Sequence, residues 1–339
     1  MLQRAAPAFP MSHFVRQSKV RNITSNADAE RLRIGIDTPW YHICANLFQF
    51  RHVFVAPPKH EESFDGLRLA TAQGEQQYIK GNTKFFAVAL SGGGGPVGIF
   101  DLKKAGRVEA SVPVIAGHSA AVMDFEFNPF HEHIIATGSE DTTIKVWGIP
   151  EGGLTETITE PLVDMHAHGK KVTLLRAHPT ASNVLASMSA DQTVKVWDIE
   201  AGKEMFNNIA HGNILHDITW DYTGKNYATS CKDKNVRIFD ARQETEAVII
   251  SSAHAGAKSV KLTFTGSRGK LITLGFTRQS EREIKVWDPR SVAQPLKLEK
   301  IDQASGVLIP FYDEVRFLSS NSNKGVRAST LFGLRQSRS

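Results

Sequence analysis

Cysteine and long apolar runs are the scarcest features of this 339-residue chain. Cys44 and Cys231 are its only two cysteines, so the sequence contains no disulfide framework, which favours a reducing, intracellular compartment. No apolar run reaches the roughly 18 residues that a membrane-spanning helix needs. We therefore expect no integral membrane association.

The residue sets that usually carry chemistry are also incomplete. The glycine run from Gly92 to Gly95 is not followed by the Lys-Ser/Thr pair of a phosphate-binding loop, and it indicates a hairpin turn instead. The pairs His131/His133 and His166/His168 have no third ligand at a suitable spacing for a metal. We therefore predict no cofactor, no metal and no enzymatic activity.

What the sequence does contain is a repeat. The segment SEDTTIKVW at 139–147 recurs as SADQTVKVW at 189–197 and, more loosely, as CKDKNVRIF at 231–239. A Gly-His or Ala-His pair precedes the repeated segment, as at His118 and His211, and is followed by an alternating apolar strand, a turn and a second strand. Self-similarity at a spacing of tens of residues predicts a repeat architecture.

The unit resembles the WD repeat, in which about 40 residues fold as a four-stranded blade of a β-propeller. Trp197-Asp198 and Trp287-Asp288 supply the eponymous dipeptide, whereas Gly148 and Phe239 each replace one member of it. The prediction is an all-β fold, a WD-repeat β-propeller with about six of seven blades and an incomplete ring. The strand clusters lie at about 77–108, 112–153, 168–207, 210–248, 253–298 and 305–333.

Each repeat also carries His, Ser or Thr, Asp and Trp at matching positions. These residue types could be mistaken for a catalytic triad with its partners, but an active site would not recur in every blade. In WD blades they form a chain of hydrogen bonds from a loop His through a strand hydroxyl to the Trp indole, which satisfies buried polar groups. Phe239 has no N–H donor, so we expect the fourth blade to lose one bond. The structural sets are His118, Thr137, Asp141 and Trp147; His168, Ser187, Asp191 and Trp197; and His211, Thr229 and Asp233.

Other segments resemble a particular family of WD-repeat proteins. The stretch MSHFVRQSKVR at 11–21, followed by RHVF at 51–54 and EESFDGLR at 61–68, is similar to the N-terminal signature of coronins, a family of actin regulators. Further coronin-like motifs occur in the family's order at 149–154, 232–237, 275–282 and 305–313. The pieces at 11–21 and 51–68 adjoin in coronins, whereas here residues 22–50 separate them.

This comparison divides the chain into three parts. Residues 1–50 form an N-terminal extension and a non-family insertion, with the coronin signature starting at 11–21; residues 51–333 form the WD-repeat β-propeller; and residues 334–339 form a short basic tail. We expect 22–50 to lie outside the propeller. The closing blade and the C-terminal coiled coil of the family are missing, which indicates a truncated coronin, a misassembled gene model or a splice form. Coiled-coil oligomerisation is therefore not expected, and the branch-nucleating Arp complex is a partner only of full-length relatives.

The net charge of +5 and the pI of about 9.1 favour an acidic partner. The coronin resemblance implies that this partner is filamentous actin, bound through a basic propeller surface in the cytoplasm, at the actin cytoskeleton. Arg68 falls where coronins carry an Arg implicated in filament binding. The candidate actin contacts are Arg68, Lys232, Lys234, Arg237, Arg278 and Arg282.

Other interpretations of the same features remain open. Charge at propeller edges also prevents edge-to-edge pairing of strands, so the basic residues could serve only that purpose. A general WD-repeat scaffold for protein–protein interaction would dock peptides across the mouth of the propeller. An RNA-binding propeller draws on the pI alone and lacks exposed aromatic platforms, so no nucleic acid is expected.

Overall fold

The computed structural model of this chain describes residues 63–70, 77, 79–109, 111–242, 246–312, 318–322 and 329–332. The expected extension and insertion at 1–50, including the signature at 11–21, lie outside the described residues. So does the basic tail at 334–339. The division of the chain into those parts therefore stays a prediction.

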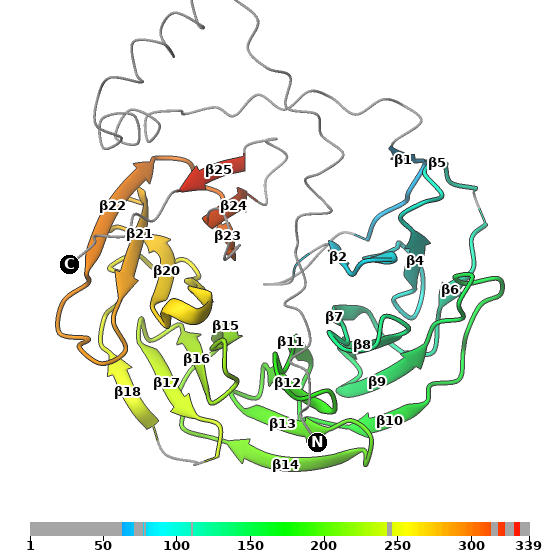
Figure 1. Cartoon of the computed structure of the whole chain (residues 1–339), viewed down its shortest axis with the longest axis horizontal. Coiled ribbons are helices and arrows are strands. Elements are labelled where there is room, and N and C mark those ends of the chain that lie inside the picture. Colours follow the sequence, from blue (N-terminus) through cyan, green and yellow to red (C-terminus); the bar gives the residue numbers. More distant parts are fainter. Residues whose placement is uncertain are drawn as a thin grey trace, which may run out of the picture.

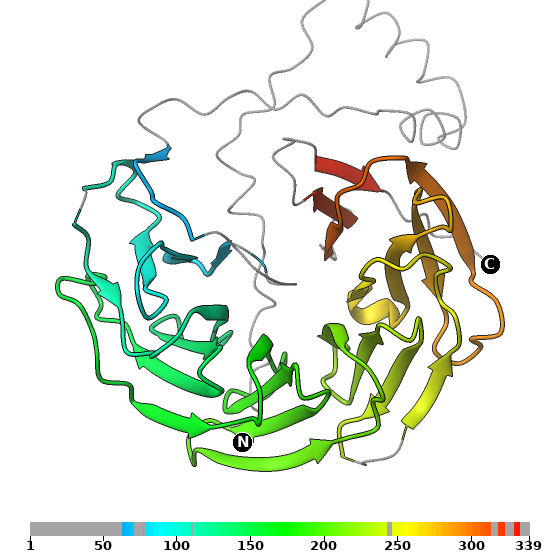
Figure 2. The ribbon, with the colours of Figure 1, turned by 180° about the vertical axis from the view of Figure 1, so that it is seen from behind.

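Six antiparallel sheets stand around a central axis and form an open ring, as the sequence predicted (Figure 1). Five of the sheets have four strands and the last has three. Within each sheet the first strand lies nearest the axis and the later strands follow outward, except that β5 lies outside its blade's order of β2-β3-β4-β6. The view from behind shows the same open ring (Figure 2). We number these sheets as blades one to six in chain order.

The strand bounds are as follows. The first blade contains β2 (Ile79–Gly81), β3 (Phe85–Ala89), β4 (Val97–Asp101) and β6 (Val114–Ile115); the second contains β7 (Val122–Phe127), β8 (Ile134–Ser139), β9 (Thr143–Gly148) and β10 (Val163–His166); and the third contains β11 (Val172–Ala177), β12 (Val184–Ser189), β13 (Val194–Asp198) and β14 (Lys203–Asn208). The fourth contains β15 (Leu215–Trp220), β16 (Asn226–Cys231), β17 (Val236–Asp240) and β18 (Glu246–Ile250); the fifth contains β19 (Lys261–Phe264), β20 (Leu271–Phe276), β21 (Arg282–Trp287) and β22 (Lys297–Asp302); and the sixth contains β23 (Leu308–Tyr312), β24 (Leu318–Ser322) and β25 (Ser329–Phe332). A short 3₁₀ turn, η2, spans Gly266–Arg268.

The expected strand clusters are offset from the blades at some boundaries. The second cluster was expected at 112–153, but Val114 and Ile115 pair with β4 of the first blade, and the outer strand β10 begins only at Val163. The outer strand of a blade comes just before the His-containing loop of the next repeat. The sequence unit therefore runs across a blade boundary.

Burial follows the stacking of the blades. The second strands β8 and β20 are buried on both faces almost throughout, because each lies between two neighbouring blades. One apolar cluster joins Phe85 and Val97 of the first blade to Val122 and Phe125 of the second, and similar clusters join each later pair. Burial of apolar area contributes about 25 cal/mol per Å², so these inter-blade contacts stabilise the stack of blades.

The first blade's other face is also covered. Phe86, Val88 and Leu90 point away from the second blade, and Phe64 and Leu67 pack over them. The ring of Phe64 meets that of Phe86 edge-on, with centroids 4.7 Å apart. Strand β1 (Phe64–Asp65), which carries Phe64, is held by parallel pairing with β5 (Gly106–Arg107). The segment before the first blade therefore shields apolar surface at the gap in the ring.

The second and third blades contain the hydrogen-bond chain described from the sequence. Trp147 Nε1 donates to Thr137 Oγ1 at 2.8 Å, Thr137 Oγ1 lies 2.7 Å from His118 Nε2, and His118 Nδ1 lies 2.9 Å from Asp141 Oδ2. In the third blade the corresponding distances are 2.8, 2.7 and 3.1 Å. These chains fasten the loop that enters each blade to the turn between its second and third strands.

The fourth blade lacks this chain. Phe239 offers no donor, and among the described residues neither ring nitrogen of His211 nor Thr229 Oγ1 has a hydrogen-bond partner. Asp233 pairs with Arg237 at 2.6 Å instead of with the histidine. Burial lowers the pKa of His211 to about 4, and the positive charge of Arg237 acts in the same direction.

The fifth blade has a chain that the sequence analysis missed. Trp287 Nε1 donates to Thr273 Oγ1 at 3.0 Å, and Thr273 Oγ1 lies 2.7 Å from His254 Nε2. Glu283, on a strand, takes the role of the turn Asp and lies 2.8 Å from His254 Nδ1. The hydroxyl and the Trp are 14 residues apart here, against 10 in the second and third blades, because the turn at 277–281 is longer. The signals that could have found it are Ala253-His254 and Trp287-Asp288.

The contrast between blades two and four gives a stability prediction. Thr137→Val removes a hydroxyl shared by His118 and Trp147, and we expect it to cost about 2–3 kcal/mol because two buried groups lose their partner. Thr229→Val is the matched control at the equivalent buried position and should be neutral or slightly stabilising, since its hydroxyl has no partner there. Urea unfolding followed by circular dichroism measures both. Equal losses in the two variants would contradict this account.

His211 gives a pH prediction. Its folded-state pKa of about 4 lies below the ordinary 6.5, so the unfolded chain binds the proton more tightly between these values. The stability that neutral His211 contributes is complete above pH 6.5 and is lost as the pH falls toward 4, by up to about 3 kcal/mol. Replacing His211 by Phe should flatten the fall in unfolding free energy across this window. The measurement is urea unfolding at pH 4.5, 5.5 and 7, and parallel curves for the two proteins would rule out the assigned titration.

Candidate functional site

One face of the ring gathers the turns between the second and third strands of the blades. Because the strands alternate in direction, the loops that lead from an outer strand to the next inner strand arrive at the same face. We call this the turn face. Its neighbouring segments touch across blades: Lys171 Nζ lies 3.1 Å from Glu140 Oε1, Lys234 Nζ donates to Ala255 O at 2.8 Å, and Lys258 Nζ donates to Ser305 O at 3.0 Å.

The glycine run forms the turn-face hairpin of the first blade, as expected. It joins β3 to β4, and its last member, Gly95, has a φ of 60°. A Cβ at Gly95 would lie 2.2 Å from the backbone nitrogen of Val122. Glycine is therefore required here both by the backbone angle and by the close approach of the second blade.

Four of the six candidate actin contacts lie exposed on the turn face. Arg68 belongs to the segment that covers the first blade, and its carbonyl accepts a hydrogen bond from Ser91 N at 2.8 Å. Lys232 and Lys234 stand in the turn of the fourth blade, and Arg278 stands in the turn of the fifth. The structure therefore brings residues from three blades to one surface.

The other two candidates have partners inside the protein. Arg237 is partly buried and pairs with Asp233. Arg282 is 5% exposed and pairs with Asp302 through two of its guanidinium nitrogens. In this structure both side chains hold their own blades together.

The turn face carries an excess of unpaired positive charge. Its carboxylates are engaged: Glu140 pairs with Lys171, and Glu281 pairs with Lys300 at 2.6 Å. Among the described residues, no ion pair joins a carboxylate to the exposed side chains of Arg68, Lys170, Lys232 and Arg278.

The carboxylates of the hydrogen-bond chains remain ionised. Burial acts to raise the pKa of Asp141, but hydrogen bonds from Thr143 and His118 outweigh it and lower this pKa to about 2. Burial likewise acts to raise the pKa of Asp191, but the hydrogen bond from Thr193 and the interaction with His168 lower it. Both carboxylates are mostly buried and accept hydrogen bonds from groups of their own blade.

The inner strands form a second polar region along the central channel. Asp124 Oδ2 accepts the backbone N–H of Leu175, and Asp217 Oδ2 accepts that of Leu262, both at 2.9 Å, so each carboxylate reaches the next blade's inner strand. Arg176 lies between the two carboxylates. Its Nη1 is 3.4 Å from Asp124 Oδ2, and its Nη2 is 3.4 Å from Asp217 Oδ1.

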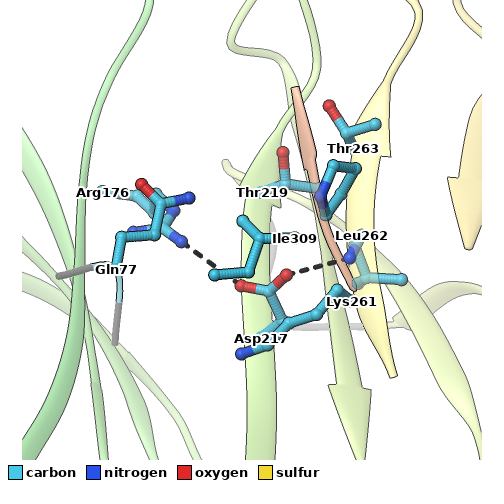
Figure 3. Close-up of a pocket in the computed structure, with 9 residues that line it drawn as sticks. Gln77, Arg176, Asp217, Thr219, Lys261, Leu262, Thr263 and Ile309 are labelled. Atoms are coloured by element: carbon cyan, nitrogen blue, oxygen red, sulfur yellow. Dashed lines mark hydrogen bonds and ion pairs between the residues drawn. The ribbon is translucent and has the colours of Figure 1, made fainter. Parts of the chain in front are cut away.

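A small cavity of about 120 Å³ opens beside these groups (Figure 3). Arg176 and Asp217 point toward one another across it, and Thr219 and Thr263 approach from neighbouring strands. Among the described residues no group of three or more His, Cys, Asp or Glu side chains could hold a metal ion. The charges here serve to join the inner strands of the blades. The full lining consists of Gln77, Arg176, Asp217, Thr219, Lys261, Leu262, Thr263, Ile309 and Pro310.

Cys231 is a buried free cysteine at the end of the second strand of the fourth blade. Burial raises the pKa of the Cys231 thiol, which opposes formation of a reactive thiolate. In the described part of the chain, no helix has the length and apolar character needed to cross a membrane.

Comparison with known proteins agrees with this architecture. Residues 49–107 match the model of a domain of unknown function, DUF1899, and residues 110–148, 159–198 and 202–240 match the WD domain, G-beta repeat. The chain is 38% identical over 284 residues to Coronin-A from Dictyostelium discoideum, an alignment that covers 82% of this chain and 63% of Coronin-A. The chain thus spans less than two thirds of the length of that relative.

Solved structures similar to this chain are also WD40 β-propellers. The WD40 domain of Toxoplasma gondii coronin superposes with a TM-score of 0.74 at 33% identity, covering 77% of this chain and 68% of the other. The WD40 β-propeller domain of Doa1 superposes with a TM-score of 0.57 at 15% identity, covering 76% and 78%, and shows the fold alone. On the strength of the sequence relationship and the shared propeller, the chain belongs to the coronin family.

Proposed function

We propose that this chain is an actin-binding cytoskeletal regulator of the coronin type, which binds filamentous actin through its turn face. Membership of the coronin family supports the choice of partner. The observation that carries the choice of surface is that Arg68, Lys232, Lys234 and Arg278, taken from three different blades, stand exposed on one face. The protein would act in the cytoplasm, at the actin cytoskeleton.

The proposed mechanism is surface recognition, in which no bond is made or broken. Guanidinium and ammonium groups on the turn face would meet acidic side chains of the filament, and the potential would steer the encounter. The residue sets that resemble catalytic ones have structural duties instead, since each fastens a loop to its blade. No enzymatic activity is part of the proposal.

We propose, as the resemblance to the coronin family implies, that engagement of the branch-nucleating Arp complex and coiled-coil oligomerisation are activities of full-length relatives. The alternative function, a general WD-repeat scaffold, draws support from the propeller fold and from the polar cavity in the channel, where a short peptide could insert a side chain.

Charge reversal at Arg68 tests the actin proposal. Arg68→Ala should weaken filament binding roughly 2–5-fold, and Arg68→Asp should weaken it more, because repulsion is added to the lost attraction. Both effects should shrink as salt rises from about 50 to 200 mM, since the Debye length falls below about 10 Å. Co-sedimentation with actin filaments gives the affinities.

The matched control is Lys203→Asp. Lys203 is also exposed, but it begins the outer strand β14 at the end of the blade opposite the turn face. This variant should bind filaments like the wild type, and circular dichroism checks that every variant is folded. If wild type and Arg68→Asp sediment equally at every salt concentration, Arg68 is not a contact. If the folded wild type does not sediment at all, the scaffold function gains.

A further inference from the structure

The loop that joins the third blade to the fourth presents two large apolar side chains to solvent on the turn face. We call residues 209–214 the Ile209 loop. Ile209 is 75% exposed, the highest value for a large hydrophobic residue in the described chain, and Ile214 is 45% exposed. Scattered apolar residues on a surface are ordinary, but two in one six-residue loop need an explanation.

The same loop lacks the fastening of its counterparts. The loops entering the second, third and fifth blades are fixed by hydrogen bonds from His118, His168 and His254. In the Ile209 loop the corresponding His211 is buried, yet neither of its ring nitrogens has a partner among the described residues. The His211 ring packs against Phe239, with centroids 5.3 Å apart, and the remaining bonds of the loop run along its backbone, as from Cys231 Sγ to Asn213 O at 3.4 Å.

Positive charge flanks the two isoleucines. The backbone N–H of Lys232 donates to Ile214 O at 2.8 Å, which places this exposed lysine directly beside the loop. Lys234 stands in the same turn. The nearby carboxylate, Asp233, is neutralised by Arg237. A surface that fits here has an apolar hollow with carboxylates at its rim.

Charge and apolar area contribute differently to such a contact. Exposed ion pairs steer association and set specificity, but salt screens them and each adds little affinity. Interfaces obtain most of their binding free energy from a few well-packed side chains that water no longer reaches. The basic residues of the turn face therefore need an apolar anchor if the complex is to persist at physiological salt.

We propose that the Ile209 loop is this anchor, and that Ile209 and Ile214 insert into an apolar hollow with an acidic rim on the actin filament. The inference rests on the proposed function, because it names the residues that would hold the same partner on the same face.

The experiment compares filament co-sedimentation of the whole chain at about 50 and 200 mM salt, a range across which surface pairs become screened. The double variant Ile209→Thr, Ile214→Thr keeps the β-branched shape and removes apolar surface. We expect its affinity to fall about tenfold or more at both salt concentrations, as for loss of an interface hot spot. Arg68→Asp should instead lose its effect at the higher salt.

Met205→Thr is the matched control. Met205 is 59% exposed, but it lies on the outer strand β14, away from the turn face. Its substitution should leave binding unchanged, and all variants should share the wild-type melting temperature because the altered side chains are exposed. Agreement of these results supports the anchor.

Four outcomes would overturn the anchor. If the double variant sediments like the wild type while Arg68→Asp does not, the Ile209 loop is not a contact and the proposed function stands. If Met205→Thr weakens binding as much, or if the loss in the double variant disappears at the higher salt, the effect is not apolar anchoring. If the wild type itself does not bind filaments, the proposed function and the anchor both fail.

Discussion

Stacking of one blade on the next is the interaction on which the rest of this structure depends. A single blade has apolar side chains on both faces and cannot bury them alone, so each blade needs two neighbours or a substitute. Buried carboxylates set the register of this stack: Asp124 and Asp217 each accept a backbone N–H from the following blade's inner strand. Unpaired buried charges would be costly, and this pairing removes that cost while fixing one blade's height against the next. Because the strands of every blade alternate in direction from the axis outward, the turns between second and third strands all reach the same face of this stack.

Stacking also explains why the end of the ring is covered. The first blade turns Phe86 and Val88 away from the second blade, and in the described structure Phe64 and Leu67 lie over them. This arrangement also fixes Arg68, since the same short segment bonds through Arg68 O to Ser91 N at the end of the first blade. The position of the candidate contact is therefore a consequence of hydrophobic burial.

The sequence was informative wherever the relevant residues are local. The repeated segments at 139–147 and 189–197 contain the turn Asp and the Trp of the hydrogen-bond chains, and the propeller followed from them. The residue spacing of the earlier repeats did not predict the hydrogen-bond chain of the fifth blade. A longer turn there separates Trp287 further from its hydroxyl partner, and Glu283 takes the place of the turn Asp. Arg282 could not be placed as buried, because its partner Asp302 lies 20 residues away on the outer strand. The common turn face of Arg68 and Lys232 was also invisible, since it depends on how blades far apart in the chain are stacked.

The fourth blade shows how one substitution redistributes a local network. Phe239 keeps the aromatic packing of the Trp it replaces, stacking on Tyr227 with centroids 5.2 Å apart, but it removes the donor that orders Thr229 and His211. Asp233 is then free to neutralise Arg237, which takes one positive charge out of the exposed set. The positive charges of Lys232 and Lys234 stay in the exposed set. The loop that enters this blade lacks the histidine bonds of its counterparts, and it carries the exposed side chains of Ile209 and Ile214 beside Lys232. The blade in which Phe239 stands in place of Trp is thus the one whose entering loop has no histidine hydrogen bond among the described residues, and the proposed anchor lies on that loop.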